Sequence, residues 1–475
     1  MRRPPPAAVE AAVPITGAEF ACLCECLGPF EPEPRLAIAV SGGPDSTALA
    51  LLARDWVRAR RGSLLGLLVD HGLRTESTAE AGLVVGWLAR LGIESRILTW
   101  QGPKPTSGGL DAAREARLTL LIKACHDAGI LHLMFGHHRE DQAETVAIRG
   151  DRGSGPDGRA GMAAVRETRE LRLLRPLLGV QKARLAATLE QAGVPWVVDP
   201  SNRDERFGRG RLRRDQAFAV EAMWEEALAC ARSREAGDRR LAQELAHLIR
   251  LDPLGYVAVA RAGWETLAPG LRPVLLARLL TTVGGRRYPA ATRTLERLAA
   301  EFGRTVRTAG GCIVVPLSEE ILVCREPARI RHRLSLDPGS TAMWDGRYSV
   351  SVHVAVPSVE IRALGPDGVA LLSPGALEAS RSAFQPAVAL HALPSAWADG
   401  WLVACPPLGA LALPRSVDFS VSAALRPVYP LTAASFAGVN VVSNPQPPIY
   451  RLRAGPEPGA EVPSPCRRMG CTVQP

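Results

Sequence analysis

The stretch LAIAVSGGPDS, residues 36–46, joins a short apolar run to a glycine-containing turn and the start of a helix. The run has the length and composition of a buried parallel strand. The two glycines let the backbone turn tightly near a ligand, and the proline suits a first helical turn. Such a helix N-terminus can hold an anion, although an ordinary strand-to-helix turn is the alternative. The residues predicted to contact the anion are Ser41, Gly42, Gly43, Pro44, Asp45 and Ser46.

From residue 35 onward, the chain alternates apolar runs with segments of helical length. This alternation predicts βαβ units, and therefore an α/β fold with a parallel sheet and helices on both faces. Ligands of such sheets bind beyond the carboxyl ends of the strands, so polar residues that follow a run are candidate site residues. The four runs are Leu36–Val40, Leu64–Val69, Ile93–Trp100 and Leu131–Phe135.

Polar residues follow the second and third apolar runs. Asp70 and His71 come after the second run, and the Asp70 carboxylate could accept hydrogen bonds from a ribose or an adenine. After the third run, Arg114 and Arg117 lie three residues apart on one face, near the start of a predicted helix. Arginines usually avoid this end of the helix dipole, so a bound phosphate or carboxylate would explain them. The alternatives are a turn with solvated charges and a solvated helix face.

The fourth apolar run leads into GHHREDQAET, residues 136–145. If this segment is helical, His137, Asp141 and Glu144 are spaced i, i+4 and i+7 and form a single stripe. Such a stripe can hold a magnesium ion or the ammonium group of a substrate. The alternative is a helix N-terminus that is merely enriched in acidic residues.

Two further segments carry glycine and arginine. The segment GDRGSGPDGRAG, residues 150–161, is too flexible in composition to be core, and is either a lid over a ligand or a long surface loop. The segment RDERFGRGRLRR, residues 203–214, holds six arginines in twelve residues. It is either a solvated face or a stripe that binds nucleic-acid phosphates. The candidate phosphate contacts are Arg203, Arg209, Arg211 and Arg213.

The composition is that of a globular protein, and its charge suits an anionic partner. The 475 residues carry a net charge of +9 with a pI near 9.3, which fits ATP or RNA without proving either. Only Lys104, Lys123 and Lys182 among the 57 basic residues are lysines, and codon bias suffices to explain this. No apolar run of about 18 residues predicts a membrane span, and prolines and acids near the start prevent a signal-peptide core. We therefore expect a cytoplasmic protein without a membrane partner.

The first motif resembles the SGGxDS pyrophosphate loop of the ATP pyrophosphatase superfamily, whose members split ATP between its α- and β-phosphates. The motifs VDHGLR, AREAR, GHHxxDQAET, RGSGPDGxAGM, RPLL and WVVDPSN then follow in one order from Val69 to Asn202. This ordered series is similar to the bacterial tRNA(Ile)-lysidine synthetase family, and the resemblance covers about residues 34–215.

The resemblance implies an ATP-dependent ligase acting on tRNA(Ile) with a CAU anticodon. ATP at the pyrophosphate loop would adenylate O2 of the wobble cytidine (C34), and free L-lysine would attack C2 to give lysidine, AMP and pyrophosphate. Lysine binding and catalysis would lie around Asp141 and Glu144, with Arg114 or Arg117 near the reacting groups. Asp45 would lie nearer the nucleotide, beside the Asp70 and His71 segment.

One residue departs from the family pattern. The family usually has two aspartates after the histidine pair, whereas this chain has Glu140 and then Asp141. If Glu140 binds Mg²⁺ together with Asp45, its backbone must lie further from the ion than that of an aspartate, because its side chain is one methylene longer. The resemblance therefore leaves open whether Glu140 is a metal ligand.

Three other functions are alternatives to lysidine formation. A tRNA 2-thiolation enzyme with the same loop would need paired cysteines, and no CxxC pair occurs among the ten cysteines. An amidating enzyme for a small metabolite would need an ammonia source, and no glutaminase-like Cys/His element is visible. A non-catalytic RNA-binding protein would not need the acidic motif.

The composition and the hydrophobic pattern of the chain predict four regions. Residues 1–33 are rich in Pro and Ala and predict a flexible extension with a helix around Ala18–Leu27, and residues 34–215 predict the ATP-pyrophosphatase catalytic domain. Residues 216–330 predict a helical domain that contacts tRNA. Residues 331–475 predict a β-rich C-terminal region with a disordered tail. The oligomeric state is left open.

Overall fold

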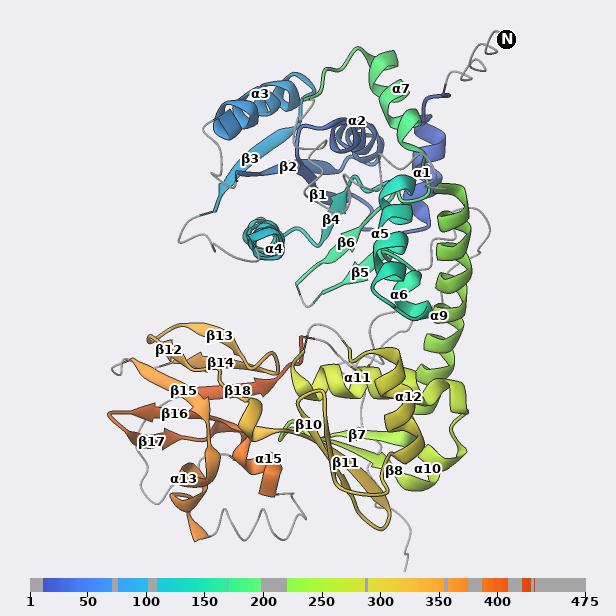
Figure 1. The fold of residues 1–475 in the computed structure, drawn as a ribbon. Coiled ribbons are helices and arrows are strands. Elements are labelled where there is room, and N and C mark those ends of the chain that lie inside the picture. The colour runs from blue at the N-terminus through green and yellow to red at the C-terminus, as the bar shows by residue number, and fades with distance from the viewer. Residues whose placement is uncertain are drawn as a thin grey trace, which may run out of the picture.

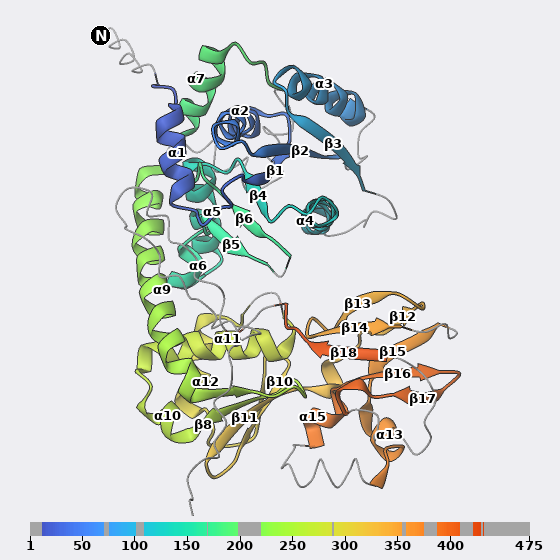
Figure 2. The ribbon, with the colours of Figure 1, turned by 180° about the vertical axis from the view of Figure 1, so that it is seen from behind.

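The computed structural model describes residues 12–70, 76–100, 109–168, 170–197, 220–286, 289–353, 358–374, 387–408, 421–428 and 431. These residues form an N-terminal α/β domain and a C-terminal half that contains three further sheets. The long helix α9 (Val220–Leu248) runs along the side of the α/β domain and down into the C-terminal half, as the two opposite views agree (Figures 1 and 2).

The N-terminal domain is built on a six-stranded sheet with the order β3-β2-β1-β4-β6-β5. All neighbouring pairs are parallel except β5 and β6. The predicted α/β fold with a mostly parallel sheet is therefore confirmed, and the first four strands coincide with the predicted apolar runs. The strands are β1 (Arg35–Val40), β2 (Ser63–Asp70), β3 (Glu94–Thr99), β4 (His132–Phe135), β5 (Val165–Glu167) and β6 (Arg172–Leu174).

Helices cover both faces of this sheet. One core joins it to α1, α2, α3 and α7, and a second core on the opposite face joins it to α4 through Leu121 and Cys125. Helix α5 instead packs against α9. The helices are α1 (Gly17–Glu25), α2 (Pro44–Arg58), α3 (Glu76–Arg90), α4 (Gly109–Asp127), α5 (Arg139–Asp151), α6 (Pro156–Arg159) and α7 (Lys182–Ala192).

The predicted loose extension is wrong for the part that the structure describes. Phe20, Leu23 and Cys24 of α1 are buried, and α1 packs on α2. The helix expected around residues 18–27 is present as α1, and its buried apolar face holds the segment on the domain.

The region after α9 is not purely helical, which corrects the predicted helical domain. It contains an antiparallel sheet with the order β7-β8-β11-β10-β9. Its central strands are apolar runs of four to six residues, which periodicity alone cannot tell from a buried helical segment. The elements are β7 (Ile249–Leu251), β8 (Val257–Ala260), α10 (Arg261–Thr266), η2 (Pro269–Leu271), α11 (Arg272–Gly284), α12 (Thr292–Glu301), β9 (Arg307–Ala309), β10 (Cys312–Pro316), β11 (Glu320–Arg325) and η3 (Pro327–Arg329).

The C-terminal region is β-rich, as predicted. It has two sheets, β12-β15-β16-β17 and β13-β14-β18, which share a core with one side of the preceding sheet. A buried charge cluster joins the preceding sheet to the turn between the second sheet's first two strands, because Arg325 Nη2 and Arg347 Nε lie 2.9 Å and 2.8 Å from the carboxylate of Asp345. The elements are β12 (Leu334–Leu336), β13 (Thr341–Trp344), β14 (Tyr348–Val352), β15 (Val359–Ala363), α13 (Gly365–Ala370), α15 (Ala387–His391), β16 (Pro394–Ala398), β17 (Trp401–Ala404), η4 (Pro406–Leu408) and β18 (Val421–Leu425).

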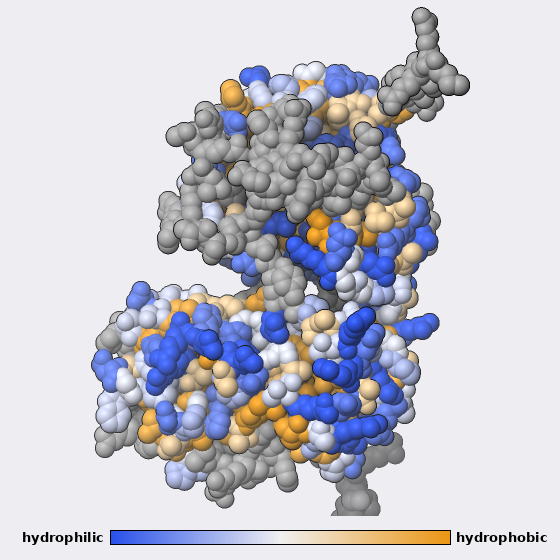
Figure 3. All heavy atoms as spheres, viewed as in Figure 1, coloured by the Kyte–Doolittle hydropathy of each residue, from blue (hydrophilic) through white to orange (hydrophobic). Residues whose placement is uncertain are grey.

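The surface is mainly hydrophilic on the face shown in Figure 3, with hydrophobic side chains in smaller patches over the C-terminal half. Among the described residues, none of the helices has the length and apolar character needed to cross a membrane.

Candidate active site

The pyrophosphate-loop motif forms the strand, turn and helix that its sequence predicts. β1 ends at Val40 and α2 begins at Pro44, which occupies the first helical turn. Gly42 has a positive φ of 83°, and a Cβ there would lie 2.6 Å from Cγ2 of Val84. Only glycine therefore fits this position, for both conformational and steric reasons.

Hydroxyl groups hold the turn in shape. The Oγ of Ser46 accepts a hydrogen bond from the backbone N–H of Ser41 at 3.1 Å, and it donates to the carbonyl oxygen of Gly43 at 3.1 Å. The two serine Oγ atoms are also 3.1 Å apart. Ser46 is buried and fixes the backbone, whereas Ser41 is exposed at the mouth of the turn. Hydrogen bonds within the chain thus define the shape of the loop.

Three helices begin around the carboxylate of Asp45. Asp45 lies in the first turn of α2, His138 is the N-cap of α5, and Lys182 is the first residue of α7. The Oδ2 atom of Asp45 is 3.5 Å from His138 Nε2 and 3.9 Å from Lys182 Nζ. The positive ends of three helix dipoles therefore converge on one place, which suits a polyanionic ligand.

His138 lies at the centre of the acidic residues. Its imidazole is buried, with Nδ1 2.9 Å from Glu140 Oε2 and Nε2 3.5 Å from Oδ2 of both Asp45 and Asp141. Burial alone would lower its pKa, but the hydrogen bonds with Asp45 and Glu140 and the charge of Asp141 outweigh it and raise the pKa to about 9. At neutral pH an imidazolium ion therefore links the three carboxylates.

The predicted stripe that starts at His137 is wrong at its first position. Helix α5 begins at Arg139, so His137 precedes the helix, and its ring stacks at a tilt near Phe135, with centroids 5.8 Å apart. His138, and not His137, meets the carboxylates of Asp45, Glu140 and Asp141, and the sequence reasoning did not select it. The only signal for it in the sequence is its position immediately before a run of acids, which suits an N-cap residue.

Asp141 and Glu144 lie on α5 as predicted, one turn apart, and both are buried. The Oδ2 atom of Asp141 accepts a hydrogen bond from the backbone N–H of His138 at 3.2 Å. This hydrogen bond holds the Asp141 carboxylate at the start of α5, where it shares the His138 imidazole with Asp45. The structure thus brings Asp45 and Asp141 together around one imidazole.

Glu140 is turned away from this pair. Its two carboxylate oxygens accept from the backbone N–H of Lys182 at 3.1 Å and 3.0 Å, and one of them also meets His138 Nδ1. Burial would raise its pKa, but His138 and the backbone N–H groups lower it overall. Glu140, which stands where the family usually has an aspartate, therefore connects α5 to the first turn of α7.

Magnesium fits the donor set around Asp45. Mg²⁺ prefers one or two carboxylates together with substrate phosphates and water. Asp45 and Asp141 offer two such oxygens beside the pyrophosphate loop, within reach of one cationic imidazole. Within the described ranges, no group of three or more His, Cys, Asp or Glu side chains could hold a metal ion, so the phosphates would have to complete the coordination.

The remaining predicted residues lie on neighbouring elements. Asp70 is the buried last residue of β2, at the same sheet edge as the loop, and His71 falls outside the described residues. Arg114 and Arg117 lie in the first half of α4. Arg117 is half-buried, and burial together with the charge of Arg114 lowers the pKa of its guanidinium. The arginine-rich segment 203–214 also falls outside the described residues.

Hydrogen bonds hold the glycine-rich segment against α5. The buried amide of Gln142 donates to the carbonyl of Met162 at 3.0 Å and accepts from its N–H at 2.7 Å. Arg149 Nη1 donates to the carbonyls of Gly158 and Gly161 at 2.8 Å and 2.9 Å. These contacts fit neither a free lid nor a loose surface loop, and Gln142 carries no sequence signal for this role.

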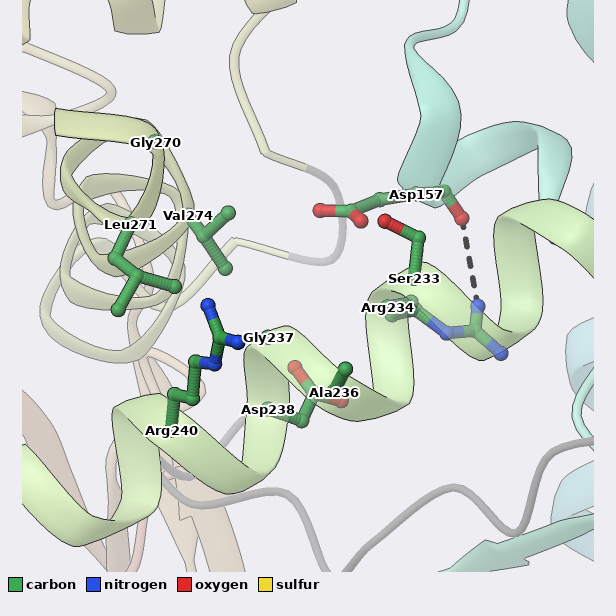
Figure 4. A pocket seen from close by; sticks show the side chains of 10 residues that line it. All are labelled: Asp157, Ser233, Arg234, Ala236, Gly237, Asp238, Arg240, Gly270, Leu271 and Val274. Carbon is green, nitrogen blue, oxygen red and sulfur yellow. Dashed lines mark hydrogen bonds between the residues drawn. The ribbon is translucent and has the colours of Figure 1, made fainter. Parts of the chain in front are cut away.

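The same segment also contacts α9. Arg159 of α6 pairs with Glu226 at 2.6 Å, and Arg234 donates to the carbonyl of Asp157 at 3.4 Å (Figure 4). Next to this contact, a pocket of about 280 Å³ lies between α6, α9 and the start of α11. Its lining mixes cationic, acidic and small side chains, and none of its lining residues belongs to the pyrophosphate loop.

Comparisons with known proteins agree with this architecture. The family described as a PP-loop domain (ATP_bind_3) matches residues 20–217. A tRNA(Ile)-lysidine synthase from Bradyrhizobium sp. strain BTAi1 is 38% identical over 349 residues, which span 67% of this chain and 97% of that protein. One from Ruegeria pomeroyi is 35% identical over 389 residues, which span 80% of this chain and 90% of that protein.

A solved structure of the U34-tRNA thiolase NcsA from Methanococcus maripaludis aligns with a TM-score of 0.37 and 16% identity, over 44% of this chain and 77% of that one. This likeness is too low to carry an argument. The identity to the two bacterial synthases extends over nearly their whole length, well beyond the nucleotide-binding domain. The chain therefore belongs to the tRNA(Ile)-lysidine synthase family.

Proposed function

We propose that this chain attaches free L-lysine to C2 of the wobble cytidine (C34) in tRNA(Ile) with a CAU anticodon, with ATP as the activating substrate. As a member of the family, it is an ATP-using ligase that forms lysidine on tRNA(Ile). The observation that supports the finer proposal is the meeting of Asp45 in the pyrophosphate loop with His138 and Asp141 at the start of α5. This contact joins a nucleotide site to an acidic site suited to an amine.

The first step activates the base. A ring carbonyl oxygen is a poor leaving group, so O2 of cytidine attacks the α-phosphorus of ATP while the bond to the bridging oxygen breaks and pyrophosphate leaves with the electron pair. The turn of Ser41 and Ser46 and the N-terminus of α2 would bind the phosphates. Asp70, the last residue of β2, and the next residue, His71, would contact the ribose or adenine. Holding both reactants at one sheet edge supplies much of the rate.

The second step needs a deprotonated amine. The side-chain ammonium of lysine has an ordinary pKa of about 10.4, so it enters charged and must lose a proton. Asp141 and Glu144 would bind the ammonium and accept that proton, and the free amine would then attack C2 and expel AMP. Arg114 or Arg117 of α4 would stabilise the anionic groups near the reaction.

Magnesium would be held by Asp45 together with the substrate phosphates and water, because both oxygens of Glu140, the other predicted ligand, already accept from the N–H of Lys182. When bound, the ion supplies charge neutralisation for the phosphates. The protein contributes the Asp45 carboxylate, which lies 3.5 Å from Nε2 of His138.

The decisive experiment is mass spectrometry of tRNA after incubation with ATP and isotope-labelled lysine. We expect the label on tRNA(Ile) with a CAU anticodon, with one AMP and one pyrophosphate released per lysine. The same tRNA carrying U34 is the control and should stay unlabelled. Incorporation of sulfur or ammonia in place of lysine, or turnover of ATP on a free nucleotide, would point to one of the rival functions.

Arg203, Arg209, Arg211 and Arg213 would contact tRNA phosphates. Changing the last three to glutamine should weaken tRNA binding and lower the slope of log affinity against log salt by about 2–3, because each phosphate contact contributes about 0.7–0.9. The matched control replaces Arg61, Arg90 and Arg96, which are exposed and lie near the starts of β2 and β3, at the sheet edge opposite the loop. This variant loses the same net charge. Equal losses in both triple variants would show that net charge, rather than this segment, governs tRNA binding.

A further inference from the structure

Lysine is rare in this chain, yet one lysine lies at the pyrophosphate loop. Of the 57 basic residues, only Lys104, Lys123 and Lys182 are lysines. Lys182 is the first residue of α7, and its Nζ lies 3.9 Å from Oδ2 of Asp45. A chain whose basic residues are almost all arginines thus has a compact ammonium group beside the pyrophosphate loop.

The backbone of Lys182 is held from two sides. Its N–H donates to both oxygens of Glu140 at 3.1 Å and 3.0 Å, which ties the first turn of α7 to α5. The rest of α7 packs on α2 through the buried Leu185 and Leu189. The Cα of Lys182 is therefore fixed relative to the loop, and only its side chain can move.

The side chain is loosely paired. The distance of 3.9 Å to Asp45 exceeds the 2.7–3.2 Å of a hydrogen bond, so the two charges attract without a direct bond. The Lys182 side chain is 44% exposed and that of Asp45 is 26% exposed, so both face the solvent at the loop. An incoming phosphate oxygen can attract the ammonium at little cost, because within the described part of the chain the Lys182 ammonium has no short hydrogen bond that must break.

We infer that Lys182 is a substrate-contacting residue that binds the β- or γ-phosphate of ATP and stabilises the departing pyrophosphate, an inference that rests on the proposed function. An ammonium is a compact point charge with three donors on a flexible stem, and it can follow phosphate oxygens as they move. The planar fork of arginine has a fixed geometry instead. The longer Glu140 side chain then positions this lysine.

The test compares nucleotides in the full-length protein. In K182M, the Kd for ATP should rise by about 10- to 100-fold, because a hydrogen bond to a charged group is lost. The Kd for AMP, which lacks the β- and γ-phosphates, should change by less than about twofold on the same argument. The KM for lysine should also stay unchanged, and K182R should fall between wild type and K182M.

The matched control is K123M. Lys123 lies on α4 and pairs with Asp127 at 2.6 Å, so it is also a lysine next to an aspartate, but away from the loop. K123M should bind both nucleotides like the wild type. A merely structural role of Lys182 would weaken ATP and AMP binding equally and lower the melting temperature, and this result would overturn the inference.

Unchanged ATP affinity in K182M would also overturn it, because the ammonium would then be only a solvated counter-charge of Asp45. Failure of the wild type itself to bind ATP is a separate outcome. It would refute the proposed function, and with it the basis of the inference, before any variant is compared.

Discussion

The D141N variant is expected to lose lysine transfer by ~10²–10⁴-fold, the usual contribution of a positioned acid or base. Asp141 is buried at the start of α5, with Oδ2 3.2 Å from the N–H of His138 and 3.5 Å from its Nε2. Asparagine keeps an oxygen that can accept from this N–H, so the cap and the helix should persist. It loses the negative charge that would bind the lysine ammonium and accept its proton.

The measurement is transfer of labelled lysine to tRNA, with tRNA binding recorded in parallel. Binding should stay within a few-fold of wild type, since Asp141 is assigned to lysine rather than to RNA. The control is D151N, at the exposed other end of the same helix. A D141N enzyme that transfers lysine at the wild-type rate would remove Asp141 from the catalytic group.

The nucleotide loop and its sheet were predictable because their signals are local. A buried strand, two glycines and a proline at a helix start lie within eleven residues, and each constrains the backbone directly. The alternation of apolar runs then determines the α/β class. The strands after α9 were missed because short apolar runs have no period that separates strand from buried helix.

The sequence predicted the start of α5 only to within a residue or two. Because of this uncertainty, the prediction selected His137 instead of His138. A stripe counted from His137 places that residue on the helix, whereas the helix begins at Arg139 and leaves His138 as its cap. Hydrogen bonds between segments distant in sequence are a second limit. Glu140 and Lys182 are 42 residues apart, and no sequence pattern predicts their contact.

The second large effect is expected from G136A, which should weaken ATP binding by more than tenfold and cost about 1–3 kcal/mol of stability. Gly136 follows β4 directly, and a Cβ there would lie 2.8 Å from the carbonyl oxygen of Asp45 and 3.0 Å from the backbone nitrogen of Ser46. Both are backbone atoms, so no change of rotamer can relieve the contact. The first turn of α2 must move away from β4.

Such a movement separates Asp45 from His138, which follows Gly136 by two residues, and displacements of about 1 Å can cost 10²-fold in activity. The measurements are ATP affinity by calorimetry and the melting temperature. The control is G150A in α5, where a Cβ meets no atom within 4 Å; there, alanine should be neutral or stabilise by about 0.5–1 kcal/mol. If G136A bound ATP like the wild type, close packing of β4 against α2 would not be what positions the loop, and the three converging helix N-termini would have to hold it on their own.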